Sequence, residues 1–256
     1  MTEEVAGRLA PREGLRVGAV DLRRIVRRIF EAAGVSEGGA DAVAGSLVDA
    51  DLRGVTSHGA MLVPMYVDRI LCGSVRPAAQ VRVVAEGPAT AVLDAQHTLG
   101  QISGDHAMDL AVEKARACGV GVVVVCHAFH FGGAFRYVER AARLGCIAIA
   151  ASNTRPLMPA PGGTRPVVGN SPIAVGVPRA GDEPILLDMA LSEAALGKIR
   201  LAAAAGEDIP LTWATDARGV PTADPAAAVD GMLLPMGGHK GFGLALVVDL
   251  LSGVLS

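Results

Sequence analysis

The sequence is poor in aromatic residues and has no long uninterrupted apolar run. Phe, Trp and Tyr together make up 3% of the 256 residues, whereas 51% of the chain is hydrophobic. Ala, Val, Leu and Ile must therefore form the core, in one large domain or two intertwined ones. The longest apolar run, GFGLALVVDLLSGVL, is interrupted by Asp249 and is too short to span a bilayer.

Charge and cysteine usage exclude further classes of protein. The net charge is −3, and no basic stripe is present, so neither nucleic acid nor a membrane is expected as a partner. The N-terminal MTEEVAGRLAPREG lacks the apolar segment of a signal peptide, and residues 1–16 are expected to form a flexible lead. The cysteines have no CxxC spacing, which argues against a zinc site or a disulfide framework and favours a cytoplasmic location: Cys72, Cys118, Cys126 and Cys146.

Hydrophobic periodicity predicts helices in the first part of the chain. One helix is expected from Asp21 until Gly34 stops it, with Leu22, Ile25, Val26, Ile29 and Ala33 on its inner face. Ser36 can cap a second helix that runs to about Arg53.

Strands and helices then alternate, which predicts the α/β class. Two strands around a Gly-Pro turn are expected in residues 81–95, buried strands in 119–128 and 146–153, and a short strand in 184–190. Helices are expected in 101–118, 134–145 and 192–206, and a last one from near Lys240. Because no G-x-G-x-x-G follows a strand, a Rossmann dinucleotide site is not predicted.

A histidine stands between Ser57 and Gly59, ahead of residues that look like an amphipathic helix. An imidazole titrates near neutral pH and can give or take a proton. Ser57 could also be an ordinary helix cap, with His58 in a structural role. The local sequence leaves both interpretations open.

Two further clusters carry polar side chains next to glycines. In CHAFHFGGAF, His127 and His130 follow a run of four valines, and functional side chains are common at the end of such a buried strand. No third metal ligand accompanies the two histidines at a recognisable spacing, so no metal site is expected. In LPMGGHKGFG, residues 234–243, backbone N–H groups and Lys240 at a helix start suit an anion such as a phosphate, although the segment could be only a tight turn.

Together these segments resemble the malate/L-lactate dehydrogenase family of the non-Rossmann type, which includes ureidoglycolate dehydrogenase, 2,3-diketogulonate reductase, sulfolactate dehydrogenase and Δ1-piperideine-2-carboxylate reductase. The resemblance extends from about Asp21 to the last residue. It rests on DLRGVTSHGA, HFGGAFRYVERAARLGCIAIAASNT, APGGTRPVVGNSPIAVGVP, LLDMALSEAALGKI, GVPTADP and LLPMGGHKGFGLALVVDLLSGVL.

The resemblance implies a fold and an activity. The fold would be the α/β, non-Rossmann L-sulfolactate/malate dehydrogenase-like fold, with a mixed-sheet nucleotide-binding domain (86–233) inserted in a helical domain made of residues 1–85 and a return helix at 234–256. The activity would be hydride transfer between NADH or NADPH (NAD or NADP) and a small 2-oxo acid, 2-hydroxy acid or cyclic imine, in a homodimer.

The resemblance also implies roles for individual residues. His58 corresponds to a proton donor in some members and His130 to a proton acceptor in others. Thr154 lies where the family places a polar residue that contacts the substrate or the nucleotide. Ser57, which can orient His58, and Arg155 are also expected to bind the substrate. The segments expected to hold the dinucleotide contain Asp188, Met189, Ala190, His239, Lys240 and Gly241.

Two features depart from the family pattern. Many members carry a carboxylate-gripping arginine four residues after the first histidine, where this chain has Leu62; Arg155 could supply a replacement charge. Related proteins also continue beyond the position of Ser256, so a further segment is expected. These departures motivate an alternative, a fold-retaining relative repurposed as a non-redox enzyme or binding protein.

Overall fold

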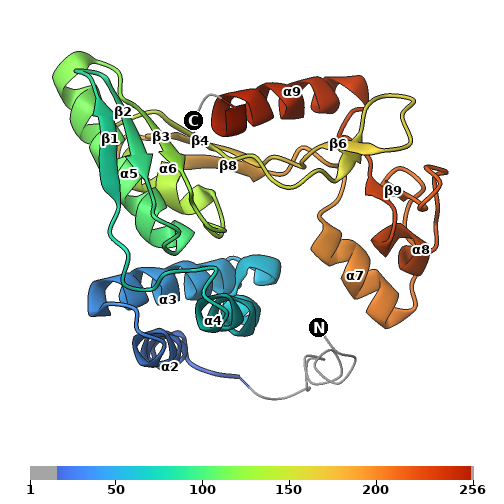
Figure 1. Ribbon diagram of the computed structural model, residues 1–256, viewed down its shortest axis with the longest axis horizontal. Helices are drawn as coiled ribbons and strands as arrows, with labels where there is room; N and C mark the ends of the chain where they lie inside the picture. Colours follow the sequence, from blue (N-terminus) through green and yellow to red (C-terminus); the bar gives the residue numbers. More distant parts are fainter. Residues whose placement is uncertain (1–15, 255–256) are drawn as a thin grey trace. The chain divides into compact units, whose positions relative to one another are not determined.

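The structure is a computed structural model that describes residues 16–254 (Figure 1). It divides into two compact units. The first consists of residues up to 82 together with 94–106 and 127–133, and the second of residues 83–93, 107–126 and those from 134 onward. The predicted flexible lead lies outside the described residues except for Arg16. The domain boundaries expected after residues 85 and 233 stay predictions.

The first unit is helical, as its periodicity predicted. Helix α2 (Ala19–Ala32) packs against α3 (Glu37–Leu52), and the Ser36 hydroxyl caps α3 by accepting a hydrogen bond from the Gly39 N–H at 3.3 Å. The expectation that Ile25 and Ile29 both point inward is wrong, since they are 49% and 37% exposed. Val26 and Phe30 are the buried residues of α2, because the face that they occupy packs on α3.

His58 lies in a short 3₁₀ turn, η1 (Thr56–His58), rather than at the mouth of a continuous helix. A second turn, η2 (Ala60–Leu62), leads into α4 (Val63–Leu71). Pro64 occupies the first turn of α4, where its missing N–H costs no hydrogen bond. The rings of Phe30 and Tyr66 meet edge to face at 6.2 Å in the core of this unit.

One sheet of the second unit has the strand order β1-β2-β3, with β1 at Arg82–Glu86, β2 at Thr90–Asp94 and β3 at Val122–Cys126. The predicted hairpin in 81–95 is therefore confirmed. Helix α5 (Gly100–Cys118) precedes β3. The expectation of a buried strand in 119–128 is wrong: Val122 is 50% exposed and the rest of β3 is half-buried, because β3 lies at the edge of its sheet. Lys114 of this helix is buried and donates to the Glu86 carboxylate at 2.8 Å and the Gly87 carbonyl at 2.9 Å, which ties the hairpin turn to α5.

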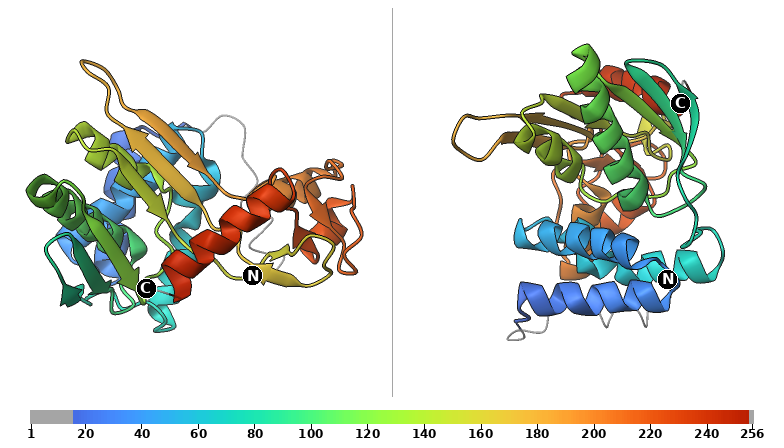
Figure 2. Two further views of the ribbon diagram at one scale, coloured as in Figure 1. Left: turned by 90° about the horizontal axis from the view of Figure 1, so that it is seen from above. Right: turned by 90° about the vertical axis from the view of Figure 1, so that its left-hand side faces the viewer.

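A second sheet, β4-β7-β8, is antiparallel throughout. Its strands are β4 (Ala148–Ala151), β7 (Ile173–Val177) and β8 (Ile185–Met189), and α6 (Phe135–Arg143) packs on it. The loop of the β7–β8 hairpin is visible in Figure 2. The expectation of a fully buried strand at 146–153 is wrong: Ile147 and Ile149 are 71% and 66% exposed, because α6 covers only the other face, where Ala148 lies.

The remaining elements of the second unit enclose a core of their own. They are β5 (Met158–Pro159), β6 (Pro166–Val168), α7 (Leu196–Ala205), β9 (Ala214–Thr215), α8 (Pro225–Val229), β10 (Met232–Leu233), α9 (His239–Asp249) and the short π-helix η3 (Leu250–Val254). Met158, Leu191, Ile199 and Leu233 lie at the centre of that core. No helix in the described part of the chain is long and apolar enough to cross a membrane.

Candidate active site

The two histidines singled out in the sequence meet in the first unit. The rings of His58 and His130 stack with centroids 5.6 Å apart and an interplanar angle of 23°. They are 72 positions apart in the chain, so only tertiary folding brings them together. Two imidazoles at this separation can share a proton-handling role at one reacting group.

An acidic side chain holds the turn that follows His58. The Asp51 carboxylate, from the end of α3, accepts a hydrogen bond from the Ala60 N–H at 2.9 Å. A Cβ atom on Gly59 would overlap this carboxylate, so the glycine is needed to make room for Asp51. On the other side, the Ser57 hydroxyl lies 3.0 Å from Nδ1 of His58, the contact expected of an orienting serine.

His130 is held from the core side by a buried tyrosine. The Tyr66 hydroxyl lies 2.5 Å from Nδ1 of His130, and the Gln101 amide Nε2 donates to the same hydroxyl at 2.8 Å. Tyr66 and Gln101 are both fully buried. Gly100 permits this packing, because a Cβ there would overlap the backbone carbonyls of Phe129 and His130.

Burial changes the acidity of both partners. It lowers the pKa of His130 from the ordinary 6.5 to about 4, and the charge of the neighbouring His58 adds to this shift. Burial also raises the pKa of the Tyr66 phenol, with the Gln101 hydrogen bond opposing it. At neutral pH His130 is therefore neutral and Tyr66 keeps its proton. His130 is crowded by protein atoms and yet keeps exposed surface, so the segment is accessible to a small molecule.

His127 does not belong to this pair. Its Nδ1 lies 3.0 Å from the Asp94 carboxylate, and its ring is 5.3 Å from that of His97. Hydrogen bonds from Gln96 and from His127 hold the pKa of the Asp94 carboxyl below its usual value. Within residues 16–254, no group of three side chains that could hold a metal ion includes His130.

The other predicted site residues lie in the second unit. The Thr154 hydroxyl donates to the Asn170 amide oxygen at 2.9 Å, and Arg155 beside it is exposed. At the end of β8, the Asp188 carboxylate accepts a hydrogen bond from the Phe135 N–H at 2.8 Å, at the start of α6. Met189 packs against the core of this unit, and Ala190 is half-buried.

The glycine-rich turn before α9 has an unusual backbone. Gly237 and Gly238 have φ values of 58° and 63°, which side chains rarely tolerate. No side chain caps the N-terminus of α9, and His239 and Lys240 in its first turn are exposed. The Gly237 N–H donates to the Glu193 carboxylate at 2.9 Å. The turn therefore already offers an N–H group to an anionic oxygen. Gly241, the next residue of α9, is buried.

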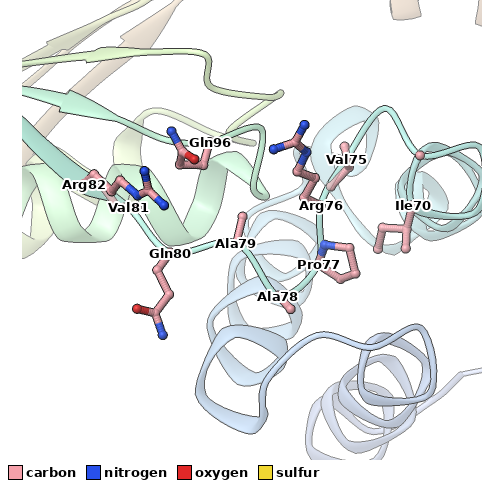
Figure 3. A pocket seen from close by; sticks show the side chains of 11 residues that line it. Ile70, Val75, Arg76, Pro77, Ala78, Ala79, Gln80, Val81, Arg82 and Gln96 are labelled. Carbon is pink, nitrogen blue, oxygen red and sulfur yellow. The ribbon is translucent and has the colours of Figure 1, made fainter.

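A cavity of about 680 Å³ opens elsewhere in the first unit, along the segment that joins α4 to β1. Figure 3 shows the side chains of Arg76, Arg82 and Gln96 around it. Neither His58 nor His130 lines this cavity, and it adds nothing to the site described above.

The sequence reading missed Asp51, Tyr66 and Gln101. Gln101 carries no local signal, since it lies within a helix and its partner is 35 residues away, whereas Asp51 begins the segment DLRGVTSHGA and is only nine residues from Ala60. Tyr66 had a weak signal: it is one of only two tyrosines in the protein and lies eight residues after His58.

Comparison with known proteins places the chain in a family. The model of the malate/L-lactate dehydrogenase family matches residues 17–256. A malate dehydrogenase of Pyrococcus abyssi is 41% identical over 94% of this chain and 69% of its own length. A (2R)-3-sulfolactate dehydrogenase (NADP(+)) of Chromohalobacter salexigens is 42% identical over 89% of this chain and 68% of its own. A ureidoglycolate dehydrogenase (NAD(+)) of Escherichia coli K12 is 37% identical over 94% and 68%.

Solved structures agree with this result. The malate dehydrogenase of Entamoeba histolytica superposes with a TM-score of 0.91 at 32% identity, covering 94% of this chain and 71% of that one. The Δ1-piperideine-2-carboxylate reductase of Pseudomonas syringae gives 0.90 at 35% identity, covering 94% and 73%. The predicted α/β, non-Rossmann fold class is confirmed, and the chain belongs to the malate/L-lactate dehydrogenase family.

Proposed function

We propose that this protein is an oxidoreductase that transfers a hydride between NAD(P)H and a small 2-oxo acid, 2-hydroxy acid or cyclic imine. The observation that carries the proposal is the stacked pair of His58 and His130, because reduction of a C=O or C=N group requires a proton as well as a hydride. Relatives named for NAD(+) and for NADP(+) support a nicotinamide cofactor.

The chain's own residues would manage the proton. His58, oriented by Ser57, would face the reacting oxygen or nitrogen and donate the proton during reduction. His130, neutral at neutral pH, would contact the same atom through a hydrogen bond, and His58 would take the proton back in the reverse reaction. Thr154 and the exposed Arg155 would bind the substrate's polar groups.

The residues of the second unit fit a dinucleotide. The turn at Gly237 and Gly238 leads into the N-terminus of α9, which no side chain caps and where Lys240 adds a positive charge. A pyrophosphate is an anion of the kind that such a helix N-terminus stabilises. His239, Gly241 and the β8 end at Asp188, Met189 and Ala190 would complete the binding residues. The nicotinamide would supply or accept the hydride when bound.

Leu62 gives a reason to keep a second candidate function. It lies four residues after His58, in the separate turn η2, and packs, partly buried, against the core of the first unit. An uncharged side chain at this position cannot form an ion pair with a substrate carboxylate. The second candidate is therefore a family member repurposed as a non-redox enzyme or binding protein.

One experiment separates the two candidates. The purified protein is mixed with NADH and NADPH in turn, and binding is followed by nicotinamide fluorescence. A panel of 2-oxo acids and cyclic imines is then added, and loss of the reduced nicotinamide absorbance is recorded. Binding with turnover supports the oxidoreductase; binding of neither nucleotide refutes it and favours the second candidate.

We also propose a cytoplasmic location and a homodimer. The location is supported by the four cysteines, all of them free among the described residues, as expected in a reducing compartment. The homodimer rests on the resemblance to the family. Light scattering on the eluted protein peak measures the mass directly, and a monomeric mass would refute it.

A further inference from the structure

The hydrogen bonds around His130 determine more than its position. The Gln101 amide donates to the Tyr66 oxygen at 2.8 Å, and that oxygen lies 2.5 Å from Nδ1 of His130. Because Tyr66 already accepts one hydrogen bond and burial keeps its own proton in place, its O–H is free to donate to the imidazole. A neutral imidazole that accepts at Nδ1 must carry its proton on Nε2.

From this geometry we propose that Tyr66, held by Gln101, is a positioning residue that locks His130 in the Nε2–H tautomer. This inference rests on the proposed function. His130 then meets the substrate's oxygen or nitrogen as a hydrogen-bond donor, and His58 is the ring that gives up the transferable proton. During reduction the proton leaves His58 for the substrate, and solvent replaces it; Tyr66 keeps its own proton throughout.

The orientation of the Gln101 amide decides the direction of the chain of hydrogen bonds. As placed, its Oε1 has no hydrogen-bond partner among the described residues. Turning the amide would let Oε1 accept from the Tyr66 hydroxyl, and the Tyr66 oxygen would then accept from Nδ1–H of His130. It would also put the amide nitrogen where Oε1 now lies, so both N–H groups would be buried without a partner. The orientation that gives the Nε2–H tautomer leaves fewer donors unpaired.

Packing keeps the hydroxyl in place. The Tyr66 ring is fully buried and meets the rings of Phe30 and Phe129 edge to face, at 6.2 Å and 5.8 Å. Its hydroxyl therefore reaches His130 from a rigid position, which is what an orienting contact needs. A Tyr66→Phe substitution removes the oxygen and keeps these ring contacts.

Nitrogen-15 NMR measures the tautomer of His130 directly, in the absence of cofactor and substrate. The ring nitrogens of histidine are labelled with nitrogen-15, and the signals of His130 are assigned by their loss in His130→Gln. At neutral pH the wild-type protein is expected to have the proton on Nε2 and a bare, hydrogen-bonded Nδ1. Tyr66→Phe is expected to give a mixture of tautomers. Tyr137→Phe, which removes the hydroxyl of the buried tyrosine in the second unit, is the matched control and should leave the His130 signals unchanged.

Activity provides the second readout. Tyr66→Phe should lower kcat by about 3- to 10-fold, the value of one such hydrogen bond, with the KM for the nicotinamide cofactor nearly unchanged. Without the hydrogen bond from Tyr66 to Nδ1, the imidazole of His130 is easier to protonate. The acid limb of the plot of kcat against pH should therefore move to higher pH. Gln101→Leu should act in the same direction with a smaller effect.

Either of two results overturns the inference. One is a wild-type spectrum with the proton on Nδ1, which remains decisive even if Tyr66→Phe fails to fold. The other is a Tyr66→Phe spectrum identical to that of the wild type. If the wild type binds neither nucleotide and yet has the proton on Nε2, the proposed function fails while the tautomer assignment stands.

Discussion

The contact between Asp51 and the turn after His58 makes a quantitative prediction about Gly59→Ala. The backbone of Gly59, with φ −91° and ψ −161°, lies in a region that alanine adopts freely. The cost of the substitution therefore comes from the Asp51 carboxylate, which a Cβ atom would overlap. Asp51 must move away and give up its 2.9 Å hydrogen bond from the Ala60 N–H.

The expected destabilisation is about 2 kcal/mol, the typical value of a hydrogen bond to a charged group. It is measured as the free energy of unfolding in urea. Asp51→Ala should cost about the same, since it removes the same bond. The double variant should also cost about 2 kcal/mol rather than the sum of both, because alanine at position 51 leaves room for the new methyl group.

Gly38→Ala is the matched control. Gly38 lies in the exposed first turn of α3, and a Cβ there would meet nothing within 4 Å. Alanine is the better helix former, so this variant should be more stable than the wild type by up to about 1 kcal/mol. A Gly59→Ala protein as stable as the wild type, or additive costs in the double variant, would refute the reasoning.

The other predictions concern the proposed chemistry. His58→Ala should leave cofactor binding nearly unchanged and lower turnover by about 10²–10⁴, the usual contribution of a general acid–base group; an unaffected rate would remove His58 from the mechanism. Leu62→Arg should improve the kcat/KM for simple 2-oxo acids such as pyruvate by adding a carboxylate contact; no gain would point to Arg155 or another anchor. The pKa of His130 is about 4 in the folded protein against the ordinary 6.5, so the unfolded chain binds more protons between these values. Stability should therefore fall as the pH drops through that range, and urea midpoints for His130→Gln should depend less on pH there; an equal dependence would refute this assignment.

Local patterns were sufficient for most elements of the chain. The Ser36 cap, the hairpin in 81–95 and the start of the last helix were predicted because each depends on residues only a few positions apart. The burial predicted for Ile29 and Ile149 was wrong because burial depends on distant parts of the chain. An apolar side chain faces inward only if another element covers it, and local sequence does not say which face α6 or α3 will cover. Strand β7 was missed, although it lies between β4 and β8 in the sheet.

The sequence by itself determined the family, and it identified the histidines proposed for acid–base chemistry and the segments in which they lie. Residue types and spacings are local properties of the sequence, and a family resemblance depends on them alone. Tertiary structure alone decided that His130 stacks on His58, that its Nδ1 meets Tyr66, and that Gly59 makes room for Asp51. Tyr66 and His130 are 64 residues apart, so their contact depends on how the helices and the loop after β3 pack together. Periodicity within one element carries no information about such a contact.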